Sequence, residues 1–122
     1  MTRFLTILVF IFILSAPLRG AWAETAYLGN IPDIPMMAGM EEVPDEGFVF
    51  DAPDGQIVRA VVFAPKKAEN DVLGYYTKVL PELGWVARKT GLFIRNGEQL
   101  TVTIGKVDGG VLATFDLSPR TD

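Results

Sequence analysis

The alternation of apolar and polar residues after Gly47 predicts β-strands arranged around one helix. Residues 48–50 form a short apolar run, and the Pro-Asp-Gly sequence at 53–55 is typical of a β-turn. The next run, residues 56–64, is almost wholly apolar, as in a strand that is covered on both faces. We therefore expect a hairpin whose second strand is central, with the helix over one face and the N-terminal segment over part of the other.

Residues 69–83 show the helical period. Their apolar side chains recur three and four positions apart along a single face, at Val72, Tyr75, Tyr76, Val79, Leu80 and Leu83. Glu69 and Asp71 lie in the first turn, where the helix dipole favours negative charge. Pro81 is expected to end or kink the helix near Leu80, and Gly84 to stop it.

After Gly84 the apolar period changes from the helical one to two. Short strands are predicted at 85–88 and 92–95, and Asn96-Gly97 is a strong hairpin signal. A further strand is predicted around 100–104, and a turn at 108–110 precedes a last inward-facing row of Val111, Ala113, Phe115 and Leu117. The order predicts an α+β fold: one helix packed on a mainly antiparallel sheet of about five or six strands, as ββα followed by a β-meander.

The first residues have the pattern of a secretory signal peptide. Arg3 supplies the positive charge, residues 4–14 are almost wholly apolar, and Ala21-Trp22-Ala23 fits the small-x-small cleavage pattern. The apolar stretch is shorter than the about 20 residues that a spanning helix needs. We expect residues 1–23 to be cleaved and the protein to reach the bacterial periplasm, with the transient signal peptide as its only membrane contact.

Residues 24–46 are rich in proline, glycine and acidic side chains. Eight acidic residues and no Lys or Arg occur between positions 24 and 58. The segment shows no sustained period, so we expect an extended N-terminal arm, followed by a single α+β domain at residues 47–119. The arm carries apolar residues that could lie across the domain: Ile31, Ile34, Met36, Met37 and Met40.

Composition excludes much catalytic chemistry. The chain has no Cys and no His, which removes disulfides, Cys/His zinc sites and histidine-assisted nucleophiles. Eleven basic and fifteen acidic residues give a net charge of −4, without the basic footprint of a nucleic-acid-binding protein. Carboxylates suited by type to glycoside hydrolysis lie in the arm, where nothing predicts the burial that acid–base catalysis needs. We expect a protein that is not an enzyme and uses no cofactor.

Two groups of residues are candidate binding sites. Met36, Met37 and Met40 offer three thioethers, soft ligands that select Cu(I), although methionine is also an adaptable packing residue and the flanking apolar residues favour packing. Tyr75 and Trp85 lie at the edge of the helix stripe and just beyond it, where an aromatic ring with a polar tip can meet a partner or an apolar ligand. Core packing is the favoured interpretation for these aromatics, because a domain of this size has little spare volume for a ligand cavity.

Two segments carry a resemblance to known proteins. Residues 75–85 read Tyr-Tyr-Thr-Lys-Val-Leu-Pro-Glu-Leu-Gly-Trp, and residues 50–58 read Phe-Asp-Ala-Pro-Asp-Gly-Gln-Ile-Val. Together they resemble a group of small exported proteins of alphaproteobacteria for which no activity is established. The likeness covers residues 36–119; it implies a periplasmic setting and a fold, and it brings no catalytic residues.

These observations favour a non-enzymatic periplasmic protein-interaction or accessory module of the cell envelope, whose partner is another envelope protein. Two alternatives remain: a periplasmic Cu(I)-binding protein that uses Met36, Met37 and Met40, and a carrier of a small apolar ligand.

Overall fold

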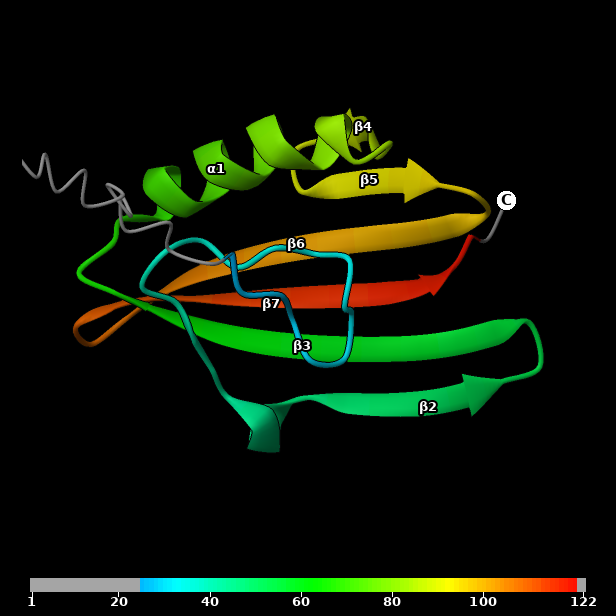
Figure 1. The fold of residues 1–122 in the computed structure, drawn as a ribbon, viewed down its shortest axis with the longest axis horizontal. Coiled ribbons are helices and arrows are strands. Elements are labelled where there is room, and N and C mark those ends of the chain that lie inside the picture. Colours follow the sequence, from blue (N-terminus) through cyan, green and yellow to red (C-terminus); the bar gives the residue numbers. More distant parts are fainter. Residues whose placement is uncertain (1–24, 121–122) are drawn as a thin grey trace, which may run out of the picture.

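Two long central strands organise the sheet, β3 (Gly55–Pro65) and β7 (Gly110–Pro119). The computed structural model describes residues 25–120, so the predicted signal peptide lies outside the described residues. Strands run in the order β1-β3-β7-β6-β5-β4, and β2 also pairs with β3, which gives seven strands, all antiparallel to their neighbours (Figure 1). The other strands are β1 (Glu41–Glu42), β2 (Phe48–Ala52), β4 (Val86–Lys89), β5 (Leu92–Arg95) and β6 (Glu98–Val107).

The α+β class is confirmed, with one α-helix on an antiparallel sheet. The expected count of five or six strands is too low, because β1 lies inside the predicted arm. This strand is only two residues long and consists of two glutamates, so no apolar alternation marked it. The elements before the helix are therefore β1, a 3-10 turn η1 (Pro44–Glu46), β2 and β3, rather than two strands alone.

Helix α1 (Glu69–Glu82) follows the predicted stripe. Val72, Tyr76 and Leu80 are its buried residues. The helix ends just after Pro81, and Gly84, at φ +92°, takes the left-handed conformation that closes it, with the Trp85 N–H donating to the Leu80 carbonyl at 3.1 Å. Within residues 25–120, no helix combines the length and apolar character required to cross a membrane.

The β5–β6 connection forms as its sequence predicts. Asn96 and Gly97 both have positive φ, at 48° and 78°, which is the conformation of the tight turns that match strand twist. Arg95 pairs with Glu98 across this turn. The meander β5-β6-β7 is therefore set by local turn chemistry.

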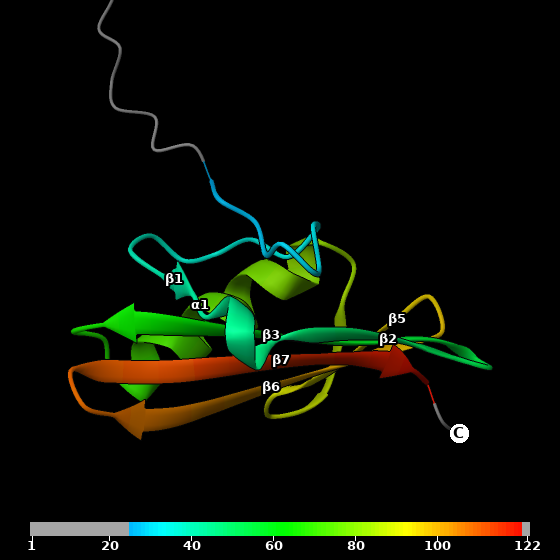
Figure 2. The same cartoon turned by 90° about the horizontal axis from the view of Figure 1, so that it is seen from below.

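The arm and the helix cover the same face of the sheet. One buried cluster joins three arm residues and three helix residues to the even-numbered positions of β3, and it contains Leu28, Ile31, Ile34, Val72, Tyr76, Leu80, Val58, Ala60, Val62 and Ala64 among others. Figure 2, which views the sheet edge-on, shows the arm on one side of the strands. The expectation that the arm lies on the face opposite the helix is wrong, and the second sheet face remains without a covering layer in residues 25–120.

The arm is not simply extended. The Leu28 N–H donates to the Ile34 carbonyl at 3.0 Å, and the Met36 N–H donates to the Ala26 carbonyl at 2.7 Å. These bonds fold the arm back on itself around Pro32, so that Ile31 and Ile34 point together into the core. The arm is thus a part of the hydrophobic core.

We expect Ile34→Ala to lower the free energy of unfolding by about 2–5 kcal/mol, because it opens a cavity between the arm and the sheet. The matched control is Ile57→Ala, at an isoleucine on β3 with 36% of its surface exposed, whose effect is about 1 kcal/mol or less. Urea denaturation of both variants measures the difference. Equal losses at the two positions would contradict the placement of the arm in the core.

Candidate functional site

The three candidate methionines and Tyr75 meet at one pocket. Met36, Met37, Met40 and Tyr75 line a cavity of about 360 Å³ between the arm and α1. All four side chains are partly buried and pack against the core cluster. The structure therefore brings together the sulfur candidates and one of the two aromatic candidates, in a pocket that suits an apolar side chain or a soft metal ion.

Tyr76, the neighbour of this pocket, holds the arm on the domain. Its hydroxyl donates a hydrogen bond to the Pro35 carbonyl at 2.8 Å and lies 3.4 Å from the Met40 sulfur. Its ring makes edge-to-face contacts with Tyr75 and Phe115, at centroid distances of 4.9 and 4.8 Å. Burial raises the pKa of Tyr76, so the hydroxyl stays protonated and remains a donor to the arm.

Trp85, the second aromatic candidate, lies in the core with 2% of its surface exposed. The guanidinium of Arg95 stacks on its ring at 4.2 Å from the centroid. Arg95 also donates to the Leu83 carbonyl at 3.0 Å and forms an ion pair with Asp33 of the arm. The Trp85–Arg95 pair therefore joins β5, the end of α1 and the arm, and it leaves Trp85 little surface for a partner.

Oxygen and nitrogen ligands do not gather in the described part of the chain. Among residues 25–120, no group of three His, Cys, Asp or Glu side chains is placed to hold a metal ion. The candidate metal ligands that share one pocket are the thioethers of Met36, Met37 and Met40.

A groove follows the free half of β6. Because β5 is four residues long and β6 is ten, β6 has no strand partner on this side beyond Thr101. The Gly91 carbonyl accepts the Val102 N–H at 2.7 Å and closes the paired region. The first turns of α1 and the β4–β5 turn complete a groove of about 490 Å³, whose lining mixes apolar side chains such as Leu73 and Ile104 with threonines, Glu69 and Lys89.

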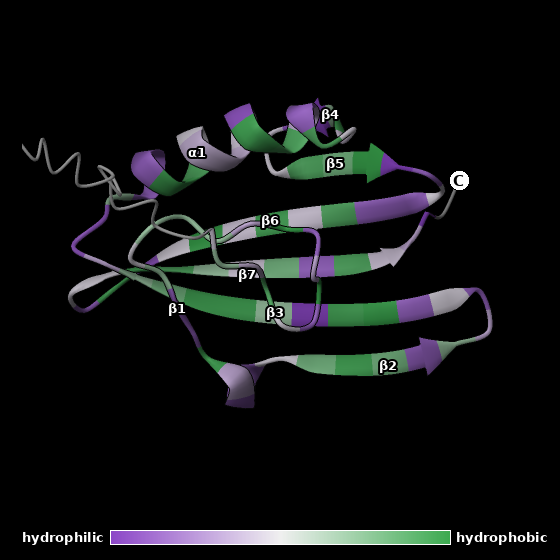
Figure 3. Ribbon diagram, viewed as in Figure 1, coloured by the Kyte–Doolittle hydropathy of each residue, from purple (hydrophilic) through white to green (hydrophobic). Residues whose placement is uncertain are grey.

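The opposite edge of the sheet carries exposed apolar side chains. In β2, Phe48, Val49 and Phe50 are 44%, 51% and 59% exposed, although they form a continuous apolar run. Figure 1 shows β2 at the outer edge beside β3, and Figure 3 shows its apolar centre, with hydrophilic residues toward the strand end. An exposed apolar edge strand is a template for pairing with another chain.

The direction of the main-chain groups in β3 follows from one hydrogen bond. The Val43 N–H donates to the Val61 carbonyl at 2.8 Å, so odd-numbered residues of β3 direct their main-chain groups toward the β1/β2 side. Direction alternates along a strand, so Arg59 and Ile57 also face that side. Their opposite residues in β2 are Phe48 and Phe50.

The open edge of β2 is consequently formed by the alternate residues. Val49 and Asp51 direct their N–H and C=O groups away from β3, since Phe48 and Phe50 use theirs in the hairpin. Among residues 25–120, no hydrogen bond joins the main chain of Val49 or Asp51 to another element. β2 therefore offers two unsatisfied donors and two unsatisfied acceptors in a row.

Acidic side chains flank this edge. Asp45 and Glu46 lie in η1 just before β2, Asp51 lies within β2, and Asp54 lies in the following turn; all four are exposed. Between residues 25 and 58 the chain has no Lys or Arg. The edge thus combines an apolar centre with negative ends.

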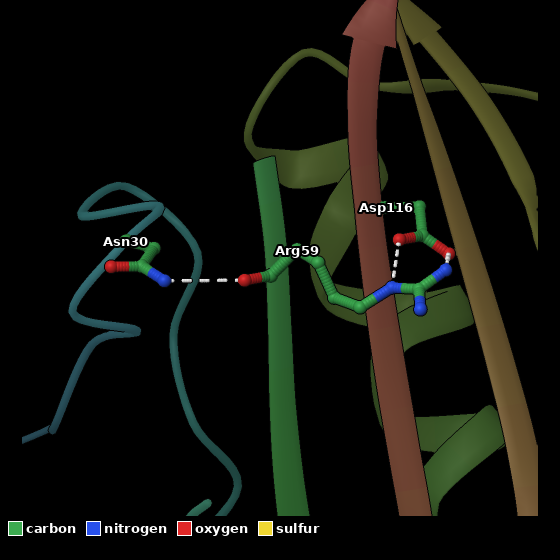
Figure 4. Close-up of polar contacts among 3 residues, drawn as sticks. All are labelled: Asn30, Arg59 and Asp116. Carbon is green, nitrogen blue, oxygen red and sulfur yellow. Dashed lines mark hydrogen bonds and ion pairs between the residues drawn. The ribbon is translucent and has the colours of Figure 1, made fainter. Parts of the chain in front are cut away.

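Arg59 is the first cation after this stretch, and its charge is paired with a carboxylate of β7. Its guanidinium forms an ion pair with Asp116 on β7 at 2.7 Å, and Figure 4 shows the side chain reaching across to that carboxylate. The hydrogen bond with Asp116 raises the pKa of Arg59. Its main-chain carbonyl accepts a bond from Asn30 of the arm at 3.2 Å, and its guanidinium lies 5.4 Å from the centre of the Phe48 ring.

Sequence reasoning identified the methionines and Tyr75 but missed the β2 edge. It predicted residues 48–50 as a short strand of a hairpin and assigned that strand no exposed edge. One signal in the sequence could have indicated an edge strand. The apolar run 48–50 has acidic residues and no Lys or Arg on either side, and charges at both ends are a feature of edge strands that a central strand does not need.

The chain matches no protein-family model, and comparisons with curated proteins and with solved structures gave no match. The candidate sites therefore rest on the geometry of this chain alone.

Tyr76→Phe is expected to lower the free energy of unfolding by about 1–3 kcal/mol, because it leaves the buried Pro35 carbonyl without its donor. Tyr75→Phe, at the neighbouring and less buried ring, serves as the control and is expected to change stability by about 0.5 kcal/mol or less. Thermal and urea unfolding give both values. A Tyr76→Phe protein as stable as the control would show that this bond does not hold the arm.

Proposed function

We propose that the protein is a non-enzymatic protein-interaction module of the bacterial cell envelope, exported to the periplasm, and that the open edge of β2 is where it binds its partner. The observation that carries the proposal is the exposure of Phe48, Val49 and Phe50 on an edge strand. These side chains lie beside main-chain groups of Val49 and Asp51 that point away from the sheet. A partner that adds a strand to this edge would satisfy the free groups and cover the apolar surface together.

The β2 edge is favoured over the groove beside β6 by its side chains. The free half of β6 includes the exposed residues Thr103, Gly105 and Lys106, and its accessible apolar side chains are Val107 and the half-buried Ile104. Glycine weakens a strand and contributes no packing. Affinity in strand addition comes from main-chain bonds, but specificity comes from side chains, and β2 supplies both.

We expect a photo-crosslinking residue at position 50 to give discrete adducts with envelope proteins in bacterial cells. Val49→Pro is expected to abolish them, because proline removes the outward N–H but no bond to β3. Val49→Thr keeps the N–H and is expected to retain the adducts. Denaturing gels of intact cells show the result.

The control is the same crosslinking residue at Lys78, which is exposed on the helix. Adducts of equal yield at Lys78, or adducts at position 50 that survive Val49→Pro in a folded protein, would contradict binding at the β2 edge.

A second candidate function is Cu(I) binding, and the shared pocket of Met36, Met37 and Met40 is the observation that favours it. Thioethers are soft ligands that select Cu(I) over harder ions. The Met40 sulfur already lies close to the Tyr76 hydroxyl, so a bound ion would compete with that contact.

Native mass spectrometry after anaerobic loading with Cu(I) tests this candidate. A copper site at the pocket predicts stoichiometric metal in the parent protein and its loss when the three methionines are changed together to leucine. The variant Tyr75→Phe, which keeps every sulfur, is expected to retain the metal. A parent protein that binds no Cu(I) would overturn this candidate.

The carrier of a small apolar ligand has less support. The groove of about 490 Å³ beside β6 is large enough for such a ligand, but threonines and charged side chains form much of its lining. The lining therefore does not select an apolar molecule.

A further inference from the structure

We infer that the partner of the β2 edge is an extended, basic polypeptide segment with alternating apolar residues, which adds to the sheet as an outer strand. This inference rests on the proposed function, and it names the chemistry of the segment that β2 selects. The open main-chain groups and the exposed rings of Phe48 and Phe50 favour an added strand. The acidic side chains around them favour a strand that carries positive charge.

The two faces of β2 set the side-chain pattern of the added strand. Phe48 and Phe50 lie opposite Arg59 and Ile57, on the sheet face without a covering layer. Residues of an added strand that lie opposite these rings share that face, so they are expected to be apolar. Asp51 lies on the other face and opposite Gln56, so the residue across from it on the added strand is expected to be Lys or Arg.

Acidic side chains at both ends of β2 also favour a basic segment. Asp45 and Glu46 precede the strand and Asp54 follows it, and all three are exposed. A segment long enough to cover β2 would place its own ends beside these carboxylates. Opposite charges there strengthen the association and like charges weaken it.

The same charges oppose pairing of β2 with a second copy of this chain. In an antiparallel pair centred on Phe50, Glu46 of each copy lies opposite Asp54 of the other. Because Val49 and Asp51 carry the outward main-chain groups, the register can shift only by two residues, and a pair centred on Asp51 places the two Asp51 carboxylates opposite each other. Both arrangements bring carboxylates together, which destabilises the pair. The acidic ends keep the exposed edge from pairing with itself while they attract a basic partner.

The test uses two fluorescein-labelled probe peptides, Lys-Val-Thr-Val-Lys and Glu-Val-Thr-Val-Glu. Each peptide is titrated with the purified exported protein at low salt, and fluorescence anisotropy measures its binding. We expect the lysine peptide to bind at least about tenfold more tightly, and its advantage to shrink as salt screens the charges. The double variant Glu46→Lys/Asp51→Lys is expected to reverse the preference. Val49→Pro is expected to lose binding of both peptides, whereas Val49→Thr retains it.

Several outcomes would overturn the inference. Equal binding of the two peptides would show that β2 does not select its partner by charge. Crosslinks at position 50 that are lost in Val49→Pro would, in that case, still support binding at the β2 edge. Failure of both peptides to bind a folded parent protein would remove the extended basic segment as the occupant. A concentration-dependent dimer in sedimentation, lost in Val49→Pro, would identify a second copy as the occupant instead.

Discussion

Burial of Tyr76 beneath the arm is the contact on which the remaining structure depends. The ring packs on Phe115 of the sheet, and the hydroxyl donates to Pro35 of the arm, so a single side chain of α1 joins the helix, the sheet and the arm. Arg95 repeats this connection at the other end of the helix through Trp85 and Asp33. With no Cys in the chain, these contacts and the apolar residues of the arm join the helix, the sheet and the arm without disulfides.

This arrangement has a consequence for the surface. Because the arm and the helix occupy the same face, the other face and the β2 edge receive no covering element within residues 25–120. An apolar strand at such an edge is an aggregation hazard unless charge or a partner controls it. The carboxylates at both ends of β2 provide the charge, and under the proposed function the exposed rings of Phe48 and Phe50 are the contact surface for a partner.

The regular elements were predictable because local patterns determine them. The helix stripe, the Asn96-Gly97 turn and the alternating rows of β6 and β7 each follow from period and turn chemistry. The path of the arm was not predictable, since its isolated apolar residues fit either face of the sheet and only packing with Tyr76 selects one. The exposure of residues 48–50 was hidden for the same reason: an apolar run is identical in sequence at a sheet centre and at an edge. The methionine pocket required both the folded arm and the helix, which no local pattern brings together.

Amide hydrogen exchange at Val49 and Asp51 tests the central claim most directly, because their N–H groups face away from β3. The account predicts fast exchange of these two amides in the free protein and slow exchange after saturation with the lysine peptide. The Phe48 and Phe50 amides, which already bond to β3, are predicted to be protected in both states. Fast exchange at Val49 and Asp51 in the saturated complex would contradict strand addition at this edge.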